Sequence, residues 1–143
     1  MIVELRVALL HEHGRNPIYN RLRHDLAARA RRLFLAQLRL PNEVTLLAEW
    51  QGTVVGILRC LHSAGHPLLQ PEVYGYISSV YVRPEARRAG ILRALVAAAA
   101  DWCKDRGLTE MRLHNAADNP LSNAAWEALG FRIVEHLRMR TVD

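Results

Sequence analysis

Cysteine is scarce in this sequence, and no paired cysteine motif is present. The two cysteines, Cys60 and Cys103, stand far apart and form neither a CxxC pair nor a disulfide framework. A chain of 143 residues can bury a hydrophobic core without covalent cross-links. We therefore expect two buried thiols, one domain over residues 1–143, and a reducing compartment such as the cytoplasm.

Long apolar runs and metal-binding motifs are missing as well. The longest apolar run, Ala94 to Ala100, is too short to cross a bilayer. Glu4 and Arg6 interrupt the first residues, which argues against a signal peptide. His11 and His13 lack a third ligand at a recognisable spacing and do not form HExxH. The sequence therefore predicts neither a membrane partner nor a metal site.

Lysine is nearly absent, since Lys104 is the one lysine among 19 basic residues and the rest are arginine. The formal charge of +5 favours an anionic ligand, and the planar arginine fork suits phosphate. Nucleic acid is an alternative partner, but aromatic residues for base stacking make up only 6% of the chain. The arginines between residues 19 and 40 also fall on several sides of a predicted helix, so a solvated face is favoured; they are Arg21, Arg23, Arg29, Arg31, Arg32 and Arg39.

Hydrophobic periodicity and turn residues predict an alternation of strands and helices. Strands are expected at Met1–Val7, Val44–Glu49, Thr53–Leu61, Val73–Val82, Glu110–Asn115 and Phe131–Val142. Helices are expected at about Tyr19–Leu40, from Ile91 to a C-cap at Gly107, and at Leu121–Leu129. This order predicts an α/β (α+β) fold with a mixed, mostly antiparallel central sheet flanked by helices.

The loop PEARRAG joins the fourth predicted strand to the second predicted helix. Backbone amides at a helix N-terminus have no internal partners and face the positive end of the helix dipole, so a phosphate can bind there. Gly90 allows close approach, and Arg87, Arg88 and Arg93 can add charged hydrogen bonds. A tight turn with solvated arginines is the alternative. The loop matches neither GxGxxG nor GxxxxGK[ST].

The segment VRPEARRAGILRAL resembles the acyl-CoA-binding motif of the GNAT superfamily of N-acetyltransferases. In that motif a V-x-P strand end leads into [Q/R]-x-x-G-x-[G/A] and a helix. Arg87, Arg88, Ala89 and Gly90 match its first four positions. Leu92 stands where the family prefers a second Gly or Ala, which crowds the approach to the pyrophosphate.

A second segment, NPLSNAAWEALGF, resembles the family's N-x-x-A-x-x-x-Y-x-x-x-G-F region. Asn119 matches the asparagine that contacts the pantetheine arm, Ser122 replaces the alanine, and Trp126 replaces the tyrosine. Trp126 is expected to pack against the pantetheine or in the core. An indole donates a hydrogen bond but does not titrate usefully, so Trp126 cannot supply the proton that the tyrosine often provides.

The resemblance implies an N-acetyltransferase that moves the acetyl group of acetyl-CoA to a primary amine of a small molecule or peptide by direct attack. A non-catalytic acyl-CoA-binding or regulatory module is the alternative. The resemblance places acceptor selection at the first long helix and at the loop HSAGHPLLQPE, and the acceptor itself stays open. The residues expected to bind CoA are Val80, Tyr81, Val82, Arg87, Arg88, Ala89, Gly90, Ile91, Leu92, Arg93, Asn119 and Trp126.

The central strand YGYISSVYV carries no carboxylate where some family members place a catalytic base, so the catalytic groups must come from other residue types. The candidates are a water relay through Ser78 or Ser79, a tyrosine such as Tyr76 or Tyr81, and His114. We predict Tyr76 and Ser79 as the catalytic residues. The alternative for Tyr76 is ordinary packing on the strand, and the alternative for Ser79 is a place in a β-bulge. The terminal strand and the hairpin offer free edges through which a homodimer can form.

Overall fold

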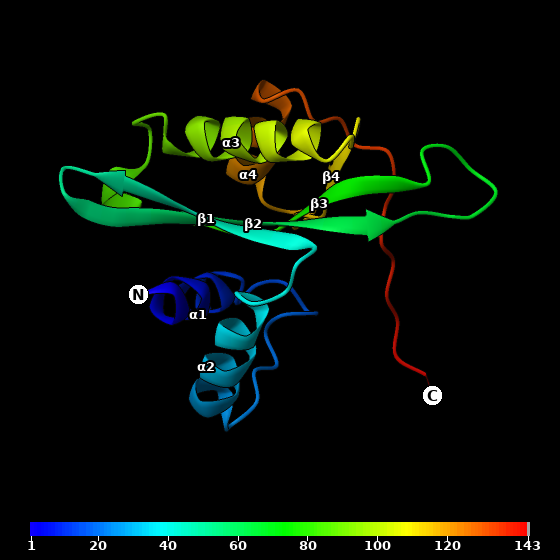
Figure 1. Cartoon of the computed structure of the whole chain (residues 1–143). Helices are drawn as coiled ribbons and strands as arrows, with labels where there is room; N and C mark the ends of the chain where they lie inside the picture. The colour runs from blue at the N-terminus through cyan, green and yellow to red at the C-terminus, as the bar shows by residue number, and fades with distance from the viewer. Residues whose placement is uncertain (143) are drawn as a thin grey trace.

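A computed structural model describes residues 1–142 of the chain, with a four-stranded sheet between two layers of helices (Figure 1). Helices α3 and α4 cover one face of the sheet, and α1 and α2 lie on the other. A short 3-10 turn, η1, follows the third strand. In chain order the elements are α1 (Ile2–Glu12), α2 (Leu26–Gln37), β1 (Glu43–Trp50), β2 (Thr53–Ala64), β3 (Val73–Val82), η1 (Pro84–Ala86), α3 (Ile91–Asp105), β4 (Met111–Leu113) and α4 (Pro120–Ala128).

The sheet has the strand order β1-β2-β3-β4, with antiparallel pairs except for the parallel pair β3 and β4. The predicted hairpin is confirmed, because Trp50 pairs with Thr53 across Gln51 and Gly52. Both turn residues have positive φ angles, 53° and 78°, as a two-residue hairpin turn of the primed type requires. The mixed, mostly antiparallel sheet flanked by helices is therefore confirmed.

The core between the sheet and α3 is closely packed. Leu58, Cys60 and Ile77 meet Leu95, Ala99 and Cys103 of α3 in one buried cluster. Gly75 on β3 permits this approach, because a Cβ atom there would lie 2.5 Å from the sulfur of Cys103. The expectation of buried thiols is confirmed, and the two sulfur atoms lie 3.8 Å apart.

The N-terminal prediction of a strand at Met1–Val7 is wrong, because residues Ile2–Glu12 form helix α1. The β-branched residues of this segment favour a strand locally, but Leu5 is fully buried beneath the sheet in the helix. Strong helix formers continue to Leu10, beyond the segment that was assigned to the strand. Tertiary packing of Leu5 therefore outweighs the local preference.

The second prediction to be corrected is the long helix at about Tyr19–Leu40, since regular α2 begins only at Leu26. Residues 15–20 form turns, and Asn20 and His24 are weak helix formers. Asp25 stands at the N-cap position, and its carboxylate pairs with Arg29 one turn later. The helix starts where these interactions become available.

The predicted terminal strand at Phe131–Val142 is also wrong, because residues 131–142 have no regular secondary structure. A strand is stabilised by cross-strand partners, and β4 offers only three residues. Several apolar side chains of this segment are exposed, namely Ile133, Val134, Leu137 and Met139. The strand predicted at Glu110–Asn115 is shortened to Met111–Leu113. Among the helices of residues 1–142, none has both the length and the apolar character to cross a membrane.

Candidate functional site

The sheet opens between β3 and β4. Only Gly75, Tyr76 and Ile77 of β3 pair with β4, so within residues 1–142 the rest of β3 has no partner on that edge. A bulge lies at this point, because Ser79 has a positive φ of 54° and the register with β2 shifts there. Val80 and Val82 pack their side chains against the α3 core, which leaves their backbone groups beside the opening. The structure thus presents free peptide groups from the bulge to the end of β3.

The loop that follows ends in an amide-rich turn at the start of α3. Arg88 and Gly90 have positive φ angles of 65° and 78°, and the first bond of the helix runs from the Ala94 amide to the Gly90 carbonyl. Within residues 1–142, the backbone amides from Arg88 to Arg93 have no hydrogen-bond partner. Such a row of free amides at a helix N-terminus is a binding site for a phosphate group. Leu92 is half-buried against the core, so its side chain lies to one side of the helix start.

The two arginines at the start of this motif have different environments. Arg87 donates to both carboxylate oxygens of Glu12 at 2.8 and 2.9 Å, and its Nε donates to the Val82 carbonyl. Its guanidinium also lies 5.7 Å from the centre of the Tyr81 ring. The side chains of Arg88 and Arg93 are exposed and make no hydrogen bond within residues 1–142. Arg88 and Arg93 are therefore the arginines available to an incoming anion.

The second motif lies on α4 and the segment before it. Asn119 is the N-cap of α4, and its side-chain oxygen accepts a hydrogen bond from the Ser122 amide. Trp126 packs against the core and meets Phe131 edge to face at 5.4 Å. For Trp126 the structure agrees with the core-packing alternative. The predicted role of Asn119 toward the pantetheine arm stays a prediction.

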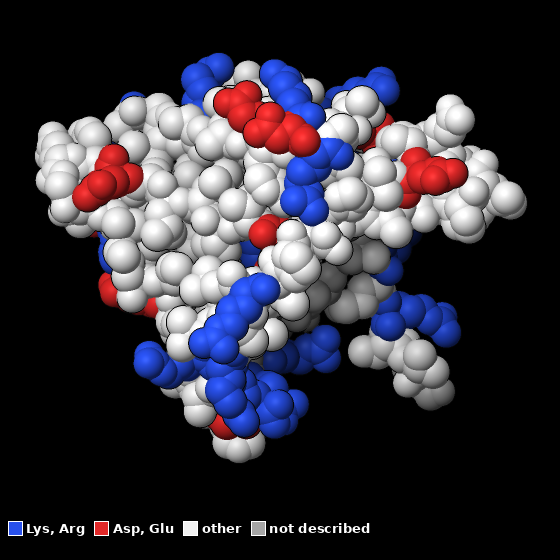
Figure 2. Space-filling model, viewed as in Figure 1, with Lys and Arg blue, Asp and Glu red and all other residues white. Residues whose placement is uncertain are grey.

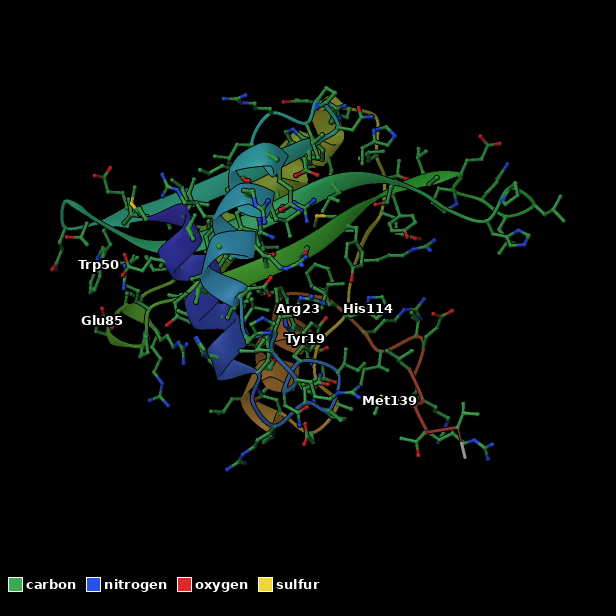
Figure 3. The ribbon with its side chains drawn as sticks, turned by 90° about the horizontal axis from the view of Figure 1, so that it is seen from below. Tyr19, Arg23, Trp50, Glu85, His114 and Met139 are labelled. Atoms are coloured by element: carbon green, nitrogen blue, oxygen red, sulfur yellow. The ribbon has the colours of Figure 1, made fainter. Side chains whose placement is uncertain are left out.

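Two of the candidate catalytic side chains meet on the α1 face of the sheet. The Tyr76 hydroxyl lies 2.6 Å from Nδ1 of His114, which brings together residues 38 positions apart. Burial is the main cause that raises the pKa of Tyr76, and the phenols of Tyr19 and Tyr74 raise it further. Tyr19 comes from the segment before α2, and Figure 3, seen from below, draws it beside His114 in projection. Tyr76 therefore stays protonated at neutral pH and is able to donate its proton.

A cavity of about 620 Å³ lies between α1, α2 and the bulge of β3, and the sequence did not indicate it. Ser79 lines its floor, and the arginines that line it are Arg6, Arg23, Arg29 and Arg32. Arg6 was missed because α1 was expected to be a strand. The excess of arginine in residues 21–32 was the available signal, but the position of Arg6 in the cavity wall could not be seen from spacing.

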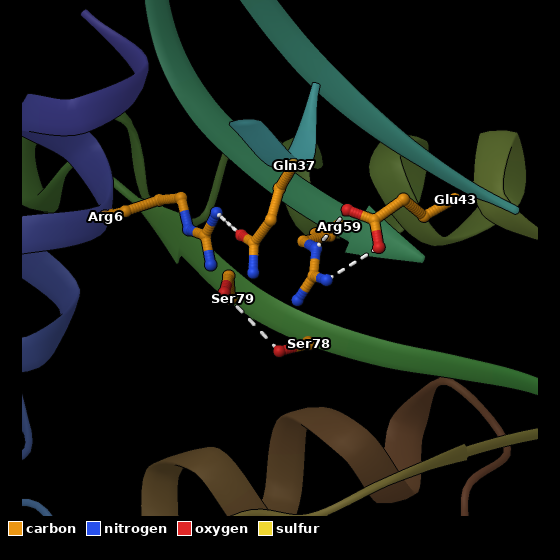
Figure 4. Close-up of polar contacts among 6 residues, drawn as sticks. All are labelled: Arg6, Gln37, Glu43, Arg59, Ser78 and Ser79. Atoms are coloured by element: carbon orange, nitrogen blue, oxygen red, sulfur yellow. Dashed lines mark hydrogen bonds and ion pairs between the residues drawn. The ribbon is translucent and has the colours of Figure 1, made fainter. Parts of the chain in front are cut away.

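The floor of this region also holds a buried ion pair, shown in Figure 4. Arg59 of β2 donates through Nε and Nη2 to the two oxygens of Glu43 at 2.8 and 2.7 Å. Both side chains are largely buried, so the Glu43 carboxylate is fully engaged by Arg59. Ser78 and Ser79 lie nearby, with their hydroxyl oxygens 3.4 Å apart. Within residues 1–142, no three histidine, cysteine or acidic side chains are grouped to hold a metal ion.

Known proteins with similar sequences match this chain over about half its length. An aminoglycoside N(6')-acetyltransferase type 1 from Acinetobacter baumannii is 35% identical over 68 residues, which cover 48% of this chain and 47% of that protein. The corresponding enzyme from Klebsiella aerogenes is 40% identical over 63 residues, or 44% of this chain and 41% of that protein. The matched part thus spans about half the length of these relatives.

Solved structures share the fold over nearly the whole chain. An aminoglycoside 6'-N-acetyltransferase from Acinetobacter haemolyticus superimposes with a TM-score of 0.73 and 25% identity, over 87% of this chain and 86% of that one. A predicted acetyltransferase from Clostridium acetobutylicum, solved with acetyl-CoA, gives a TM-score of 0.78 at 20% identity, over 97% and 87% of the two chains. A sequence profile described as acetyltransferase (GNAT) family matches residues 7–131. The chain belongs to the acetyltransferase (GNAT) family.

Proposed function

We propose that this protein is an N-acetyltransferase that transfers the acetyl group of acetyl-CoA to a primary amine of a small molecule by direct attack. The observation that carries the proposal is the continuous row of free amides from Arg88 to Arg93, beside the free edge of β3. This arrangement suits a pyrophosphate followed by an amide-containing arm. The acetyl-CoA and CoA in the structures of similar proteins support the same co-substrate.

The bulge positions the reactive end of the donor. A pantetheine arm that follows the free edge of β3 from the helix start runs back toward Ser79 and Val80. The free amide next to the bulge can donate to the thioester oxygen, which gains negative charge when the amine attacks. Ser79 lies on both this edge and the cavity, so an amine in the cavity reaches the thioester there.

The reaction also needs proton transfers at nitrogen and at sulfur. The ammonium form of the acceptor first loses a proton to water, and the neutral amine nitrogen then forms a bond to the carbonyl carbon. As the carbon–sulfur bond breaks, the nitrogen loses a second proton to water and becomes an amide. The leaving thiolate needs a proton, and Tyr76 can donate one because burial keeps it protonated. His114, whose Nδ1 lies 2.6 Å from the Tyr76 oxygen, orients the phenol and can exchange a proton with it.

The direct test is to incubate the protein with acetyl-CoA and a panel of primary amines, and to follow the release of free CoA thiol. In parallel, the thermal unfolding midpoint is measured with and without CoA. Thiol release that depends on an amine, together with thermal stabilisation, is expected. Stabilisation without turnover on any amine would favour the non-catalytic acyl-CoA-binding module, and the absence of both effects would overturn the proposal.

Four further expectations accompany this function. That residues 1–143 form a single domain stays a prediction, as does a location in the cytoplasm. A homodimer also stays a prediction, and sedimentation velocity would test it. Nucleic-acid binding is disfavoured because aromatic residues for base stacking are scarce, and because Arg29 and Arg32 of α2 border a cavity whose size suits a small ligand.

A further inference from the structure

We propose that the acceptor amine belongs to a small molecule that also carries an anionic oxygen group, a carboxylate or a phosphate, and that the arginines of the α1–α2 cavity bind this group. The inference rests on the proposed function, because it names the acceptor of that reaction. It separates this protein from the relatives named as aminoglycoside N(6')-acetyltransferases, because an aminoglycoside carries several amines and no acidic group.

The charge of the cavity wall is strongly one-sided. Four guanidinium groups and no carboxylate line the cavity. Two carboxylates lie close behind it, Asp25 paired with Arg23 and Arg29, and Glu43 paired with Arg59. With Arg59 included, five guanidinium groups meet two carboxylates, which leaves three positive charges without a counter-charge in this region. Figure 2 shows basic side chains gathered over α2.

Arg6 supplies the most specific feature, because it is a cation held in place with unused donors. The residue is only 6% exposed, its guanidinium carbon lies 3.7 Å from the centre of the Phe34 ring, and its Nη1 donates to Gln37 at 2.5 Å. Its Nε is buried and has no hydrogen-bond partner within residues 1–142, and Nη2 has none either. A buried donor without a partner costs free energy, so an acceptor oxygen of a ligand or of a water molecule would be stabilised there.

The two free nitrogens of Arg6 lie on one edge of the guanidinium. Arg59 uses the same pair of nitrogens, Nε and Nη2, to hold the two oxygens of Glu43. This edge can therefore grip a carboxylate or phosphate with two parallel hydrogen bonds. Burial and the nearby Arg59 charge lower the pKa of Arg6 to about 10, so the side chain is still charged at neutral pH.

The position of Arg6 relative to the bulge fits a small acceptor. Figure 4 shows the Arg6 guanidinium directed toward Ser79 on β3. An anionic group at Arg6 would hold the rest of the molecule beside the free edge where the thioester is expected. The volume of about 620 Å³ suits a small molecule. The surrounding positive charge also disfavours the ammonium form of the amine, which helps a site whose nearby carboxylates, Asp25 and Glu43, are already paired with arginines.

The test compares three acceptors of similar length that differ in charge, and one larger polycation. β-Alanine carries a carboxylate, its carboxamide is neutral at that end, 2-aminoethyl phosphate carries a phosphate, and kanamycin is a polycation. Acetyl transfer to each is followed by CoA thiol release, and binding of each to the CoA-saturated protein is measured by calorimetry. At least one anionic acceptor is expected to show a kcat/KM at least tenfold above that of the carboxamide, and to bind more tightly. Comparison of β-alanine with 2-aminoethyl phosphate shows whether the site prefers a carboxylate or a phosphate.

Variants test whether the cavity arginines cause the preference. Arg32→Gln removes a charge from the cavity wall, and Arg31→Gln is the matched control, because Arg31 is the neighbouring arginine on α2 and does not line the cavity. Arg6→Gln tests the role of the buried guanidinium, and circular dichroism checks that this variant folds. We expect KM for the anionic acceptor to rise at least tenfold in Arg6→Gln and several-fold in Arg32→Gln. KM for the carboxamide is expected to stay unchanged, and Arg31→Gln is expected to behave as the wild type.

Failure of this inference differs from failure of the proposed function. The inference would be overturned if kcat/KM for kanamycin or for the carboxamide equalled or exceeded the values for both anionic amines. That result would leave the acetyltransferase proposal standing. Lack of thiol release with every amine would count against the function. In that case, calorimetric binding without a preference for the anionic molecules would overturn the inference as well.

Discussion

Arg87 and Arg88 are neighbours in the sequence, but the fold gives them different tasks. Glu12 of α1 engages Arg87, so this arginine ties the first helix to the loop after β3. Arg88 is exposed, has a left-handed backbone conformation, and makes no side-chain bond within residues 1–142. The motif alone treats the two as equivalent phosphate ligands, whereas their partners predict different effects on CoA.

Replacing Arg88 by glutamine should therefore weaken CoA more than the same change at Arg87. We expect the Kd of CoA to rise about fivefold in Arg88→Gln, because one exposed charged hydrogen bond to phosphate is lost. Arg87→Gln should change the Kd by less than about twofold and cost less than ~1 kcal/mol of stability, as for an exposed ion pair. Calorimetry measures both values. Pantetheine, which has no phosphate, is the control ligand, and an equal loss of pantetheine affinity would contradict this assignment.

Tyr76→Phe should lower kcat while the KM for acetyl-CoA stays close to the wild-type value. Loss of a proton donor to the leaving thiolate typically costs about 10²-fold in rate, and Tyr76 is the phenol that contacts His114. Tyr74→Phe is a matched control, because Tyr74 lies on the same strand and stacks against Arg112 without a hydrogen bond within residues 1–142. Steady-state kinetics of the wild type and both variants measure kcat and the KM for acetyl-CoA. A kcat that falls equally in both variants would point to packing instead of proton transfer.

At the scale of elements, the packing of α3 on the sheet determines where the amide-rich loop lies. Gly75 of β3 lies against Cys103 of α3, and a Cβ atom at position 75 would require one of them to shift. The loop from Pro84 to Gly90 spans the distance from the end of β3 to the start of this helix. The spacing between strand and helix thus fixes the free amides against the open edge of β3.

A methyl group at position 75 should therefore destabilise the fold. Gly75→Ala places a Cβ 2.5 Å from the Cys103 sulfur, and overpacking of this kind costs about 1–3 kcal/mol. Cys103→Ala removes the clashing atom, so the double variant should be more stable than the sum of the single changes predicts, by roughly 1 kcal/mol. Urea unfolding of the four proteins gives this coupling. Additive effects would show that the sheet and the helix simply move apart.

Local signals predicted some of these elements well and others badly. The hairpin, β3, α3 and α4 depend on turn residues, caps and periodicity within each segment, so the sequence indicates them. Helix α1 and the irregular C-terminal segment depend on partners elsewhere in the chain, which one segment cannot reveal. The loop proposed to bind CoA was therefore predictable from the sequence RRAG. The cavity between α1 and α2 was not, because Arg6 reaches it only when residues 2–12 are helical.

At the scale of the whole molecule, the buried thiol of Cys60 links stability to pH. Burial, and next the Cys103 thiol, raise the pKa of Cys60 from 9.0 to about 12. Between these values the unfolded chain loses the proton and the folded chain keeps it. Stability is therefore fully present below about pH 9 and falls as the pH rises toward 12, at up to ~1.4 kcal/mol per pH unit.

Urea unfolding at pH 8 and pH 10 tests this linkage. The wild type should lose on the order of 1 kcal/mol between the two values through Cys60. Cys60→Ala should start from a lower stability, because it leaves a small cavity in the core, but should lose less on going to pH 10. The raised pKa of Tyr76 acts in the same direction only above about pH 10. Equal losses in wild type and variant would contradict a role for this thiol.

Helix α2 carries the outer wall of the cavity, and among the helices and strands it makes its main contacts with α1 and not with the sheet. The amide-rich loop, by contrast, belongs to β3 and α3 on the other side of the molecule. Substitutions on the exposed surface of α2 can therefore accumulate without disturbing the core beneath α3. Over evolution, such a layout lets a lineage exchange one acceptor for another while it inherits the donor site unchanged.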